Sequence, residues 1–308
     1  MKIIEQAITD RYSVYHADTV DVARGLPDSS VHFSVFSPPF SSLYTYSASA
    51  RDLGNSRDDS EFWAQYRFLI AETFRVMMSG RLVAIHCMDL PSSKTFHGHI
   101  GLRDFPGDII RAYEDVGFIY HSRITIWKDP VTAMQRTKAL GLLHKTIRKD
   151  SAMSRQGIPD TVVVMRKPGG NPEPIAHTSD EFPVEMWQRY ASPVWVTTAG
   201  QDNEGFAICE EDIHPGDTLQ YRSARENEDE KHICPLQLSV IERCIRLWSN
   251  PNDIVWSPFM GIGSEGYVAI REGRRFLGAE LKASYYKQAV ANLEAIRNPT
   301  QAQMTLFG

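Results

Sequence analysis

Four consecutive residues, Ser37-Pro38-Pro39-Phe40, place a hydroxyl, two prolines and an aromatic ring directly after an apolar run. The prolines lack a backbone N–H and hold the chain extended, which fixes the Ser37 hydroxyl and the Pro38 carbonyl as acceptors. Two acceptors directed at one amino group can draw its nitrogen toward tetrahedral geometry, so that its lone pair points at an electrophilic methyl group. The Phe40 ring offers a face on which a base can stack. A simple strand terminator is the alternative, because Pro-Pro often follows a strand.

A glycine-rich turn near the other end of the chain has the spacing of a nucleotide-binding turn. Residues 261–266 match G-x-G-x-x-G between a strand-like and a helix-like run. Glycines at a helix N-terminus let the backbone approach a ligand closely. Glu280 closes the next strand, where a carboxylate can accept the hydrogen bonds of a ribose diol. A dinucleotide-binding fold is argued against, because it needs two βαβαβ halves and too little chain follows Gly266. A tight strand-to-helix turn that binds no ligand remains an alternative.

The segments around both motifs predict an α/β domain with a mainly parallel sheet, because strand and helix patterns alternate. Strands are expected at 31–36, 81–87, 118–127, 161–165, 253–256 and 275–281. Helices are expected at 61–78, 104–116, 236–247, 265–271 and 284–297. Asp104 is a candidate N-cap, and Ser79-Gly80 is expected to end the first of these helices.

The middle of the chain differs from both ends. Residues 129–230 hold loop-forming Pro and Gly residues and short apolar runs, and predict an insertion or second, irregular domain. This gives four parts: 1–128, the inserted 129–230, 231–297, and a tail at 298–308.

Composition sets further limits on the class of protein. The 308 residues are 42% hydrophobic and 23% charged, as in an ordinary globular protein, and no apolar run approaches the ~20 residues of a membrane helix. The N-terminus lacks the apolar core of a signal peptide, and the four cysteines form no Cys-x-x-Cys pair, so a cytoplasmic protein with reduced thiols is expected. No metal site is predicted, since Cys209, His214, His232 and Cys234 fit no standard zinc spacing.

The charge distribution leaves nucleic-acid binding open. The net charge of −5 argues weakly against it. A basic stripe from Arg123 to Lys167 is opposed by few acids, and it predicts either localised phosphate contact or a solvated surface.

Taken together, the two motifs resemble the permuted, β-group DNA amino-methyltransferases, including the orphan enzymes of phages and prophages. That family carries Asp/Asn/Ser-Pro-Pro-aromatic first, then a target-recognition region, then Asp-Pro-Phe-x-Gly-x-Gly. The resemblance spans about 14–128 and 231–297. It implies a Rossmann-like, circularly permuted methyltransferase sheet, S-adenosyl-L-methionine as cofactor, and target recognition by 129–230. Ser37, Pro38, Pro39 and Phe40 would then be catalytic.

The resemblance also implies a cofactor site. Asp18 would bond the adenine amine, Glu280 the ribose, and His232 would flank the methionine moiety. The full set implied to bind cofactor is Asp18, Ser37, His232, Ser257, Pro258, Phe259, Gly261, Gly263, Ser264, Glu280 and Leu281. Ser257 departs from the family, which usually has aspartate at that position.

The expected reaction is transfer of a methyl group to the exocyclic amine of a flipped-out base in double-stranded DNA. Adenine N6 is favoured because adenine-N6 enzymes are the larger class. Cytosine N4 is the alternative, because Ser37 replaces the aspartate common in adenine enzymes and serine is commoner in cytosine-N4 enzymes. A non-catalytic DNA-binding subunit and an RNA or protein amine methyltransferase also stay open. A homodimer and a role in restriction–modification follow from the resemblance. Candidate DNA contacts are Tyr44, Tyr46, Arg136, Lys138, Lys145, Arg148 and Arg155.

Overall fold

A nine-stranded sheet runs through the molecule in the order β1-β2-β11-β10-β3-β4-β8-β7-β9. The computed structural model describes residues 3–40, 53–56, 58–92, 94–131, 141–196, 213–214, 216–220 and 236–298. The strands are β1 (Ile3–Ile8), β2 (Tyr12–Ala17), β3 (Val31–Phe36), β4 (Met77–Met88), β7 (Ile119–Trp127), β8 (Asp160–Arg166), β9 (Val194–Val196), β10 (Ile254–Ser257) and β11 (Arg275–Glu280).

The sheet is mixed, which refines the expectation of a mainly parallel one. Five adjacent strands, β2, β11, β10, β3 and β4, are parallel, whereas β1 and β8 run against the others. The last two strands that the structure describes, β10 and β11, lie between β2 and β3. This permuted order brings the glycine-rich turn, although it comes late in the sequence, next to the segment that follows β3.

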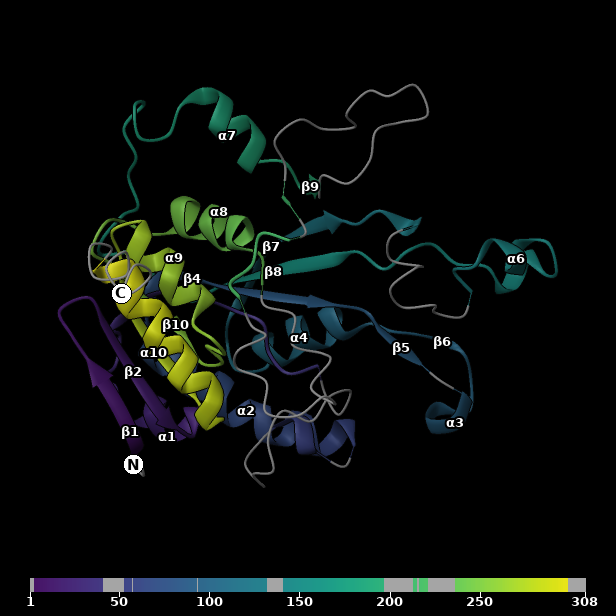
Figure 1. Ribbon diagram of the computed structural model, residues 1–308, viewed down its shortest axis with the longest axis horizontal. Coiled ribbons are helices and arrows are strands. Elements are labelled where there is room, and N and C mark those ends of the chain that lie inside the picture. Colours follow the sequence, from purple (N-terminus) through teal and green to yellow (C-terminus); the bar gives the residue numbers. More distant parts are fainter. Residues whose placement is uncertain are drawn as a thin grey trace, which may run out of the picture.

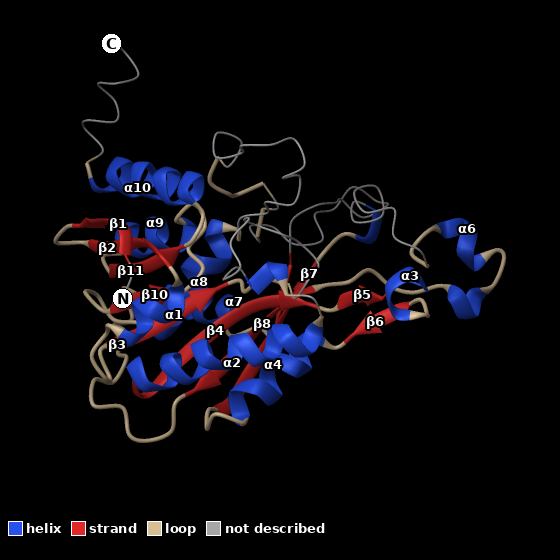
Figure 2. Ribbon diagram, turned by 90° about the horizontal axis from the view of Figure 1, so that it is seen from below, coloured by secondary structure: helices blue, strands red, loops and turns tan. Residues whose placement is uncertain are grey.

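Helices cover both faces of the sheet, which gives three layers (Figure 2). One face packs against α8 (Leu238–Trp248), α9 (Ser264–Arg271) and α10 (Ala283–Arg297), and the other against α1 (Thr19–Arg24), α2 (Asp59–Val76) and α4 (Phe105–Glu114). Alternation along the strands decides which face a residue joins: on β4, Leu82 and Ala84 face the first group, whereas Val83 and Ile85 face the second. No helix among the described residues is long and apolar enough to cross a bilayer.

The predicted helix at 61–78 differs from the observed one at both ends. Helix α2 begins after Asp58, whose side chain accepts a hydrogen bond from the Glu61 N–H at 2.9 Å, and it ends at Val76. The expectation that Ser79-Gly80 ends this helix was wrong, because β4 already begins at Met77. Gly80 lies inside the strand with a φ of +73°, where the pairing with β3 shifts register. Gly80 therefore allows the irregular backbone conformation at this point of the sheet.

Residues 129–230 contribute directly to the sheet. Strand β8 fills the space between β4 and β7, and β9 pairs with β7 at the sheet's edge. The strand expected at 161–165 is thus a central element of the main domain. The assignment of the rest of 129–230 to target recognition stays a prediction.

Two extensions project from one end of the molecule (Figure 1). One is formed by β5, α3 and β6, and the other contains α6 and η3. Helix α7 lies apart, beyond α8 (Figure 1). These elements, with the short helix η2, have the bounds β5 (Leu90–Ser92), α3 (Lys94–His97), β6 (Gly101–Arg103), α6 (His144–Ile147), η3 (Ser151–Met153), α7 (Val184–Tyr190) and η2 (Leu53–Asn55).

Candidate active site

The carboxyl ends of the five parallel strands meet at one edge of the sheet. Strand β10 pairs in parallel with β3, so that Val255 lies opposite Phe33 and Trp256 opposite Ser34. The Ser34 hydroxyl also donates a 2.8 Å hydrogen bond to the Trp256 carbonyl, which ties the two strands together. The residues after β10 and after β3 therefore emerge side by side. In open α/β sheets, ligands bind outside such carboxyl ends, where the strand order reverses.

The glycine-rich turn is held against the end of β11 by Glu280. Gly261 and Gly263 have φ values of +51° and +86°, a region that favours glycine. The Gly261 N–H donates to Glu280 Oε2 at 3.0 Å, and the Lys282 N–H donates to Oε1 at 2.8 Å. Apart from its own chain neighbours, no atom of the described residues lies within 4 Å of the place where a Cβ on Gly261 would stand. The turn thus presents open backbone at this position.

The third glycine of the motif has a packing role. A Cβ on Gly266 would lie 2.5 Å from the Phe276 ring. Helix α9 can therefore approach β11 only because this residue has no side chain.

Two buried hydroxyls beside the turn have no hydrogen-bond partner among the described residues. Ser257 ends β10 with no exposed surface, and Ser264 begins α9 with 3% of its surface exposed. Neither Oγ atom has a partner in the described part of the chain. An unsatisfied buried polar group costs about 1–3 kcal/mol, so such atoms are normally paired. Both hydroxyls fit a site that is completed by a polar ligand such as S-adenosyl-L-methionine.

Glu265 follows Ser264 on the first turn of α9 and is also buried. Burial, with a smaller contribution from the Glu280 carboxylate, raises the pKa of Glu265 to about 8. The site therefore holds one ionisable group that is mostly protonated at neutral pH.

The predicted adenine end of the cofactor site lies after β2. Asp18 is the N-cap of α1, and its Oδ1 accepts from the Val20 N–H at 2.9 Å and from the Asp21 N–H at 3.2 Å. This cap is a structural reason for an aspartate at the position, and contact with adenine stays a prediction. Nearby, His16 Nε2 lies 3.1 Å from the Leu281 carbonyl, which places Leu281 beside the end of β2.

Aromatic rings surround the reaction motif. Pro38 is buried, whereas Ser37, Pro39 and Phe40 are partly exposed. The Phe40 ring meets the Phe105 ring edge-on with 6.1 Å between centroids. Phe259, which follows Pro258 after β10, packs on Phe36 with centroids 5.8 Å apart. Phe259 is thus in aromatic contact with Phe36, the last residue of β3 and the one directly before the reaction motif.

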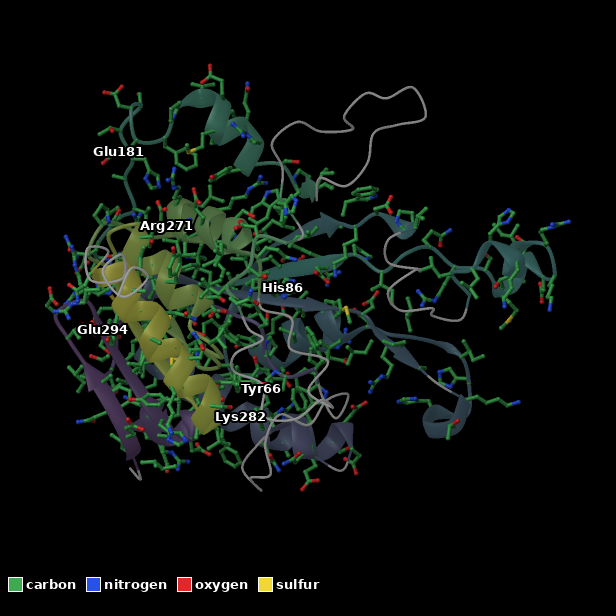
Figure 3. All side chains as sticks on the ribbon, in the orientation of Figure 1. Tyr66, His86, Glu181, Arg271, Lys282 and Glu294 are labelled. Atoms are coloured by element: carbon green, nitrogen blue, oxygen red, sulfur yellow. The ribbon has the colours of Figure 1, made fainter. Side chains whose placement is uncertain are left out.

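Ser37 has a polar partner that the sequence analysis missed. Its Oγ lies 2.8 Å from His86 Nδ1, near the end of β4. His86 Nε2 lies 3.2 Å from Asp160 Oδ2, and Lys128 Nζ lies 2.5 Å from Asp160 Oδ1. Figure 3 labels His86 in the middle of the molecule.

Asp160 is buried yet ionised. Burial alone raises the pKa of its carboxyl, but the neighbouring Lys128 and His86 outweigh burial and lower it to about 2. A negative charge is therefore held beside His86 across the physiological range of pH.

The candidate DNA contacts that the structure describes lie on the segment between β7 and β8, which leaves the sheet at this same edge because β7 runs parallel to β4. Lys145 is exposed on α6, Arg148 is exposed at the end of that helix, and Arg155 is partly buried after η3. Helix α6 is at the tip of one projecting extension (Figure 1). Tyr44, Tyr46, Arg136, Lys138 and His232 lie outside the described residues, so their predicted roles stay predictions.

One cluster at the opposite edge of the sheet has the composition of a metal site. Ligand atoms of His32, Glu173 and Asp253 lie within 4.8 Å of one another. However, His32 Nδ1 accepts from the Ile254 N–H, so the hydrogen is on Nε2, the nitrogen that faces both carboxylates. Arg81 already pairs with Asp253 at 3.0 Å. The cluster is therefore accounted for without a metal ion.

The fold and the two adjoining motifs define an α/β protein of the methyltransferase class. The sequence profile of the N6/N4 DNA methylase family matches residues 31–291, and the chain belongs to this family. It is 24% identical over 275 residues to the type II methyltransferase M.BglII of Bacillus subtilis, an alignment covering 88% of this chain and 66% of that enzyme. The chain matches less than two thirds of the length of the curated relatives it resembles.

Solved structures show the same fold over nearly the whole chain. The DNA modification methylase TTHA0409 of Thermus thermophilus, solved with S-adenosyl-L-methionine, is 22% identical, with a TM-score of 0.66 and coverage of 94% of both chains. The cytosine-N4-specific PvuII DNA methyltransferase is 16% identical, with a TM-score of 0.63 and coverage of 96% of this chain and 94% of that one. The predicted α/β methyltransferase fold is thereby confirmed.

Proposed function

We propose that this protein transfers a methyl group from S-adenosyl-L-methionine to the exocyclic amine of a base in double-stranded DNA. The observation that carries this proposal is the parallel pairing of β10 with β3, which sets the glycine-rich turn beside Ser37-Pro38-Pro39-Phe40. A cofactor on the turn and a base at the Ser-Pro-Pro-Phe segment would lie next to each other. Membership of the DNA methylase family supports both the reaction and the cofactor.

Different residues bind the cofactor and the target base in the proposed reaction. S-Adenosyl-L-methionine supplies an electrophilic methyl group on a sulfonium. The Gly261 turn, Glu280 and the hydroxyls of Ser257 and Ser264, which have no partner among the described residues, would hold this cofactor at the end of β10. The base flips out at a cost of about a few kcal/mol and stacks on Phe40, while Ser37 and Pro38 accept hydrogen bonds from its amine. Alignment of two bound reactants can lower a barrier by ~7–11 kcal/mol.

Adenine N6 is the proposed target, and cytosine N4 is the alternative. Both bases present an amino group of the same geometry, so the arrangement around Ser37 suits either. We assign target recognition to 129–230, with phosphate contacts from Lys145, Arg148 and Arg155. A homodimer and a partner restriction endonuclease follow from the family resemblance alone.

The direct test is incubation of purified protein with duplex DNA and methyl-labelled cofactor, followed by digestion to nucleosides and mass spectrometry. We expect labelled N6-methyladenine; labelled N4-methylcytosine would change the base and keep the mechanism. If RNA or protein is labelled and DNA is not, the methyl acceptor is not DNA and the proposed substrate is wrong. Cofactor binding without methyl transfer to any acceptor would indicate a non-catalytic subunit.

Substitutions at the reaction motif test the assignment of residues. Ser37→Ala should abolish most turnover, whereas Pro39→Ala should have a milder effect because it removes rigidity only. Ser30→Ala is a matched control, since Ser30 precedes the same strand at its other end and its hydroxyl bonds the Pro27 carbonyl at 2.7 Å. Full turnover of the Ser37→Ala enzyme would refute the role of that hydroxyl.

A further inference from the structure

We infer that His86, oriented by Asp160, makes the Ser37 hydroxyl an acceptor toward the target amine and takes up the proton that Ser37 passes on. This inference rests on the proposed methyl transfer and adds two positioning residues, neither of which touches the substrate. It is carried by the chain of contacts that joins Ser37, His86 and Asp160.

Strand register places these side chains together. His86 lies opposite Val162 in the antiparallel pairing of β4 with β8, and Asp160 is two residues before Val162 on the same face of β8. His86 and Asp160 are therefore diagonal neighbours across two strands. The same relation joins Asp160 to Lys128, because Asp160 lies opposite Ile126 on β7. The three side chains form a row that leads from Lys128 to Ser37.

The charge of Asp160 decides which ring nitrogen of His86 carries the proton. The 3.2 Å contact with His86 Nε2 falls outside standard hydrogen-bond geometry, but it places the nitrogen beside an ionised carboxylate. A lone pair facing that charge is repelled, whereas an N–H is attracted. Nε2 therefore carries the hydrogen, and Nδ1 of the neutral ring is an acceptor.

The Ser37 hydroxyl consequently donates to His86 Nδ1 over their 2.8 Å contact. Its lone pairs are left to face the substrate, so the serine presents acceptors to the amine as a carboxylate would. This gives a physical reason why serine can serve at the first position of the motif.

The same contacts provide a path for the proton that the reaction releases. When the target nitrogen gains the methyl group, it carries a positive charge and must lose one N–H proton. That proton passes to Ser37 Oγ as the serine's own proton passes to His86 Nδ1. One N–H bond and one O–H bond break, and one of each forms. The resulting imidazolium lies between Ser37 and the Asp160 carboxylate, with Lys128 on the far side of Asp160.

The arrangement is not that of a serine hydrolase, although the residue types agree. Such enzymes stabilise an oxyanion with backbone N–H groups near the nucleophile. The two residues after Ser37 are prolines and have no N–H. The histidine also faces the serine through Nδ1 here, whereas hydrolases of the chymotrypsin type use Nε2.

Two variants separate this role from simple packing. His86→Asn keeps an acceptor for the Ser37 hydroxyl but cannot take up a proton. Asp160→Asn keeps the shape of the side chain and removes the charge that selects the tautomer. For both, we expect the single-turnover rate of methyl transfer to fall by about 10²-fold or more, with the Kd of S-adenosyl-L-methionine within about threefold of wild type.

His121→Asn is the matched control. His121 lies near the start of β7 and is exposed, and its Nδ1 also contacts a serine hydroxyl, that of Ser122 at 2.9 Å. The chemical change is the same, but the pair lies at the other end of the sheet, so we expect the wild-type rate.

Nitrogen-15 NMR of histidine-labelled, cofactor-free protein tests the inference without activity. We expect the His86 ring in the Nε2–H form in the wild type, and loss of this preference in Asp160→Asn. A wild-type His86 with hydrogen on Nδ1, or a His86→Asn enzyme that methylates DNA at the wild-type rate, would overturn the inference. If wild-type protein transfers no methyl group to DNA, the proposed function fails, and the spectra still decide the tautomer.

Discussion

Glu265→Gln should change how the stability of the cofactor-free protein depends on pH. Glu265 is buried on the first turn of α9, and burial with the nearby Glu280 raises its pKa from 4.5 to about 8. At neutral pH the folded protein therefore keeps a proton that the unfolded chain has lost. Because the folded state binds more protons, the free energy of unfolding falls as pH rises. Glutamine has nearly the same shape and cannot titrate.

The magnitude follows from the size of the pKa shift. Each pH unit between the unfolded and folded pKa values costs about 1.4 kcal/mol. The contribution of Glu265 is fully present below about pH 4.5, and it is lost progressively until about pH 8. By pH 7 the free energy of unfolding should have lost about 3 kcal/mol of this contribution. That is a large part of the ~5–15 kcal/mol by which a typical domain is stable.

The assay is urea unfolding of both proteins, without cofactor, at about pH 5.5, 6.5 and 7.5. Between about pH 5.5 and pH 7.5, the free energy of unfolding of the variant should rise by about 2–3 kcal/mol relative to that of the wild type. Groups common to both proteins, such as His32 with its lowered pKa, cancel in this difference. Parallel curves would show that Glu265 is ionised in the folded protein, and the reasoning about burial would then be wrong.

Three further tests by substitution concern the edge of the sheet and the projecting extension. Ser257→Ala removes a buried hydroxyl that has no partner among the described residues, so it should raise the free energy of unfolding by about 1 kcal/mol and weaken cofactor binding in calorimetry. Ser34→Ala, whose hydroxyl is paired, should destabilise instead; destabilisation by both would contradict the first prediction. Gly261→Ala puts a side chain at a φ of +51°, which should cost about 1 kcal/mol and raise the cofactor Kd; unchanged binding would refute contact with the turn. Lys145→Ala with Arg148→Ala should lower the slope of log affinity for DNA against log salt by about 2, and an unchanged slope would exclude phosphate contact.

The sequence predicted the elements that carry clear periodicity and caps. The helix expected at 104–116 is α4, and Asp104 caps it through a 2.9 Å hydrogen bond from the Gly107 N–H. The turn between β10 and α9 was predicted because a positive φ favours glycine and the flanking runs were apolar. Strand β1 was missed because it is mostly exposed and its residues do not alternate cleanly. Strand β2 was missed although its buried and half-buried positions do alternate.

The sequence analysis also predicted that the two motifs share a site, but this prediction did not come from hydrophobic periodicity or turn signals. Nothing in the local sequence of β10 indicates that it pairs with β3, more than 200 residues earlier in the chain. That inference came from the order of motifs in a known family. The role of residues 129–230 in the sheet was missed because β8 was assigned to a segment whose surroundings are irregular.

The contact between His86 and Asp160 could not be predicted from the local sequence, for a physical reason. Each was visible as a polar residue at the end of an apolar strand, and such residues are common wherever strands reach solvent. What joins them is the pairing of β4 with β8, which sets His86 opposite Val162 and Asp160 one diagonal away. A shift of one residue in that register would turn Asp160 to the other face and remove the charge from His86. The identity of the residues is local, whereas the tautomer of His86 depends on a long-range pairing, so it could be argued only once the sheet was known.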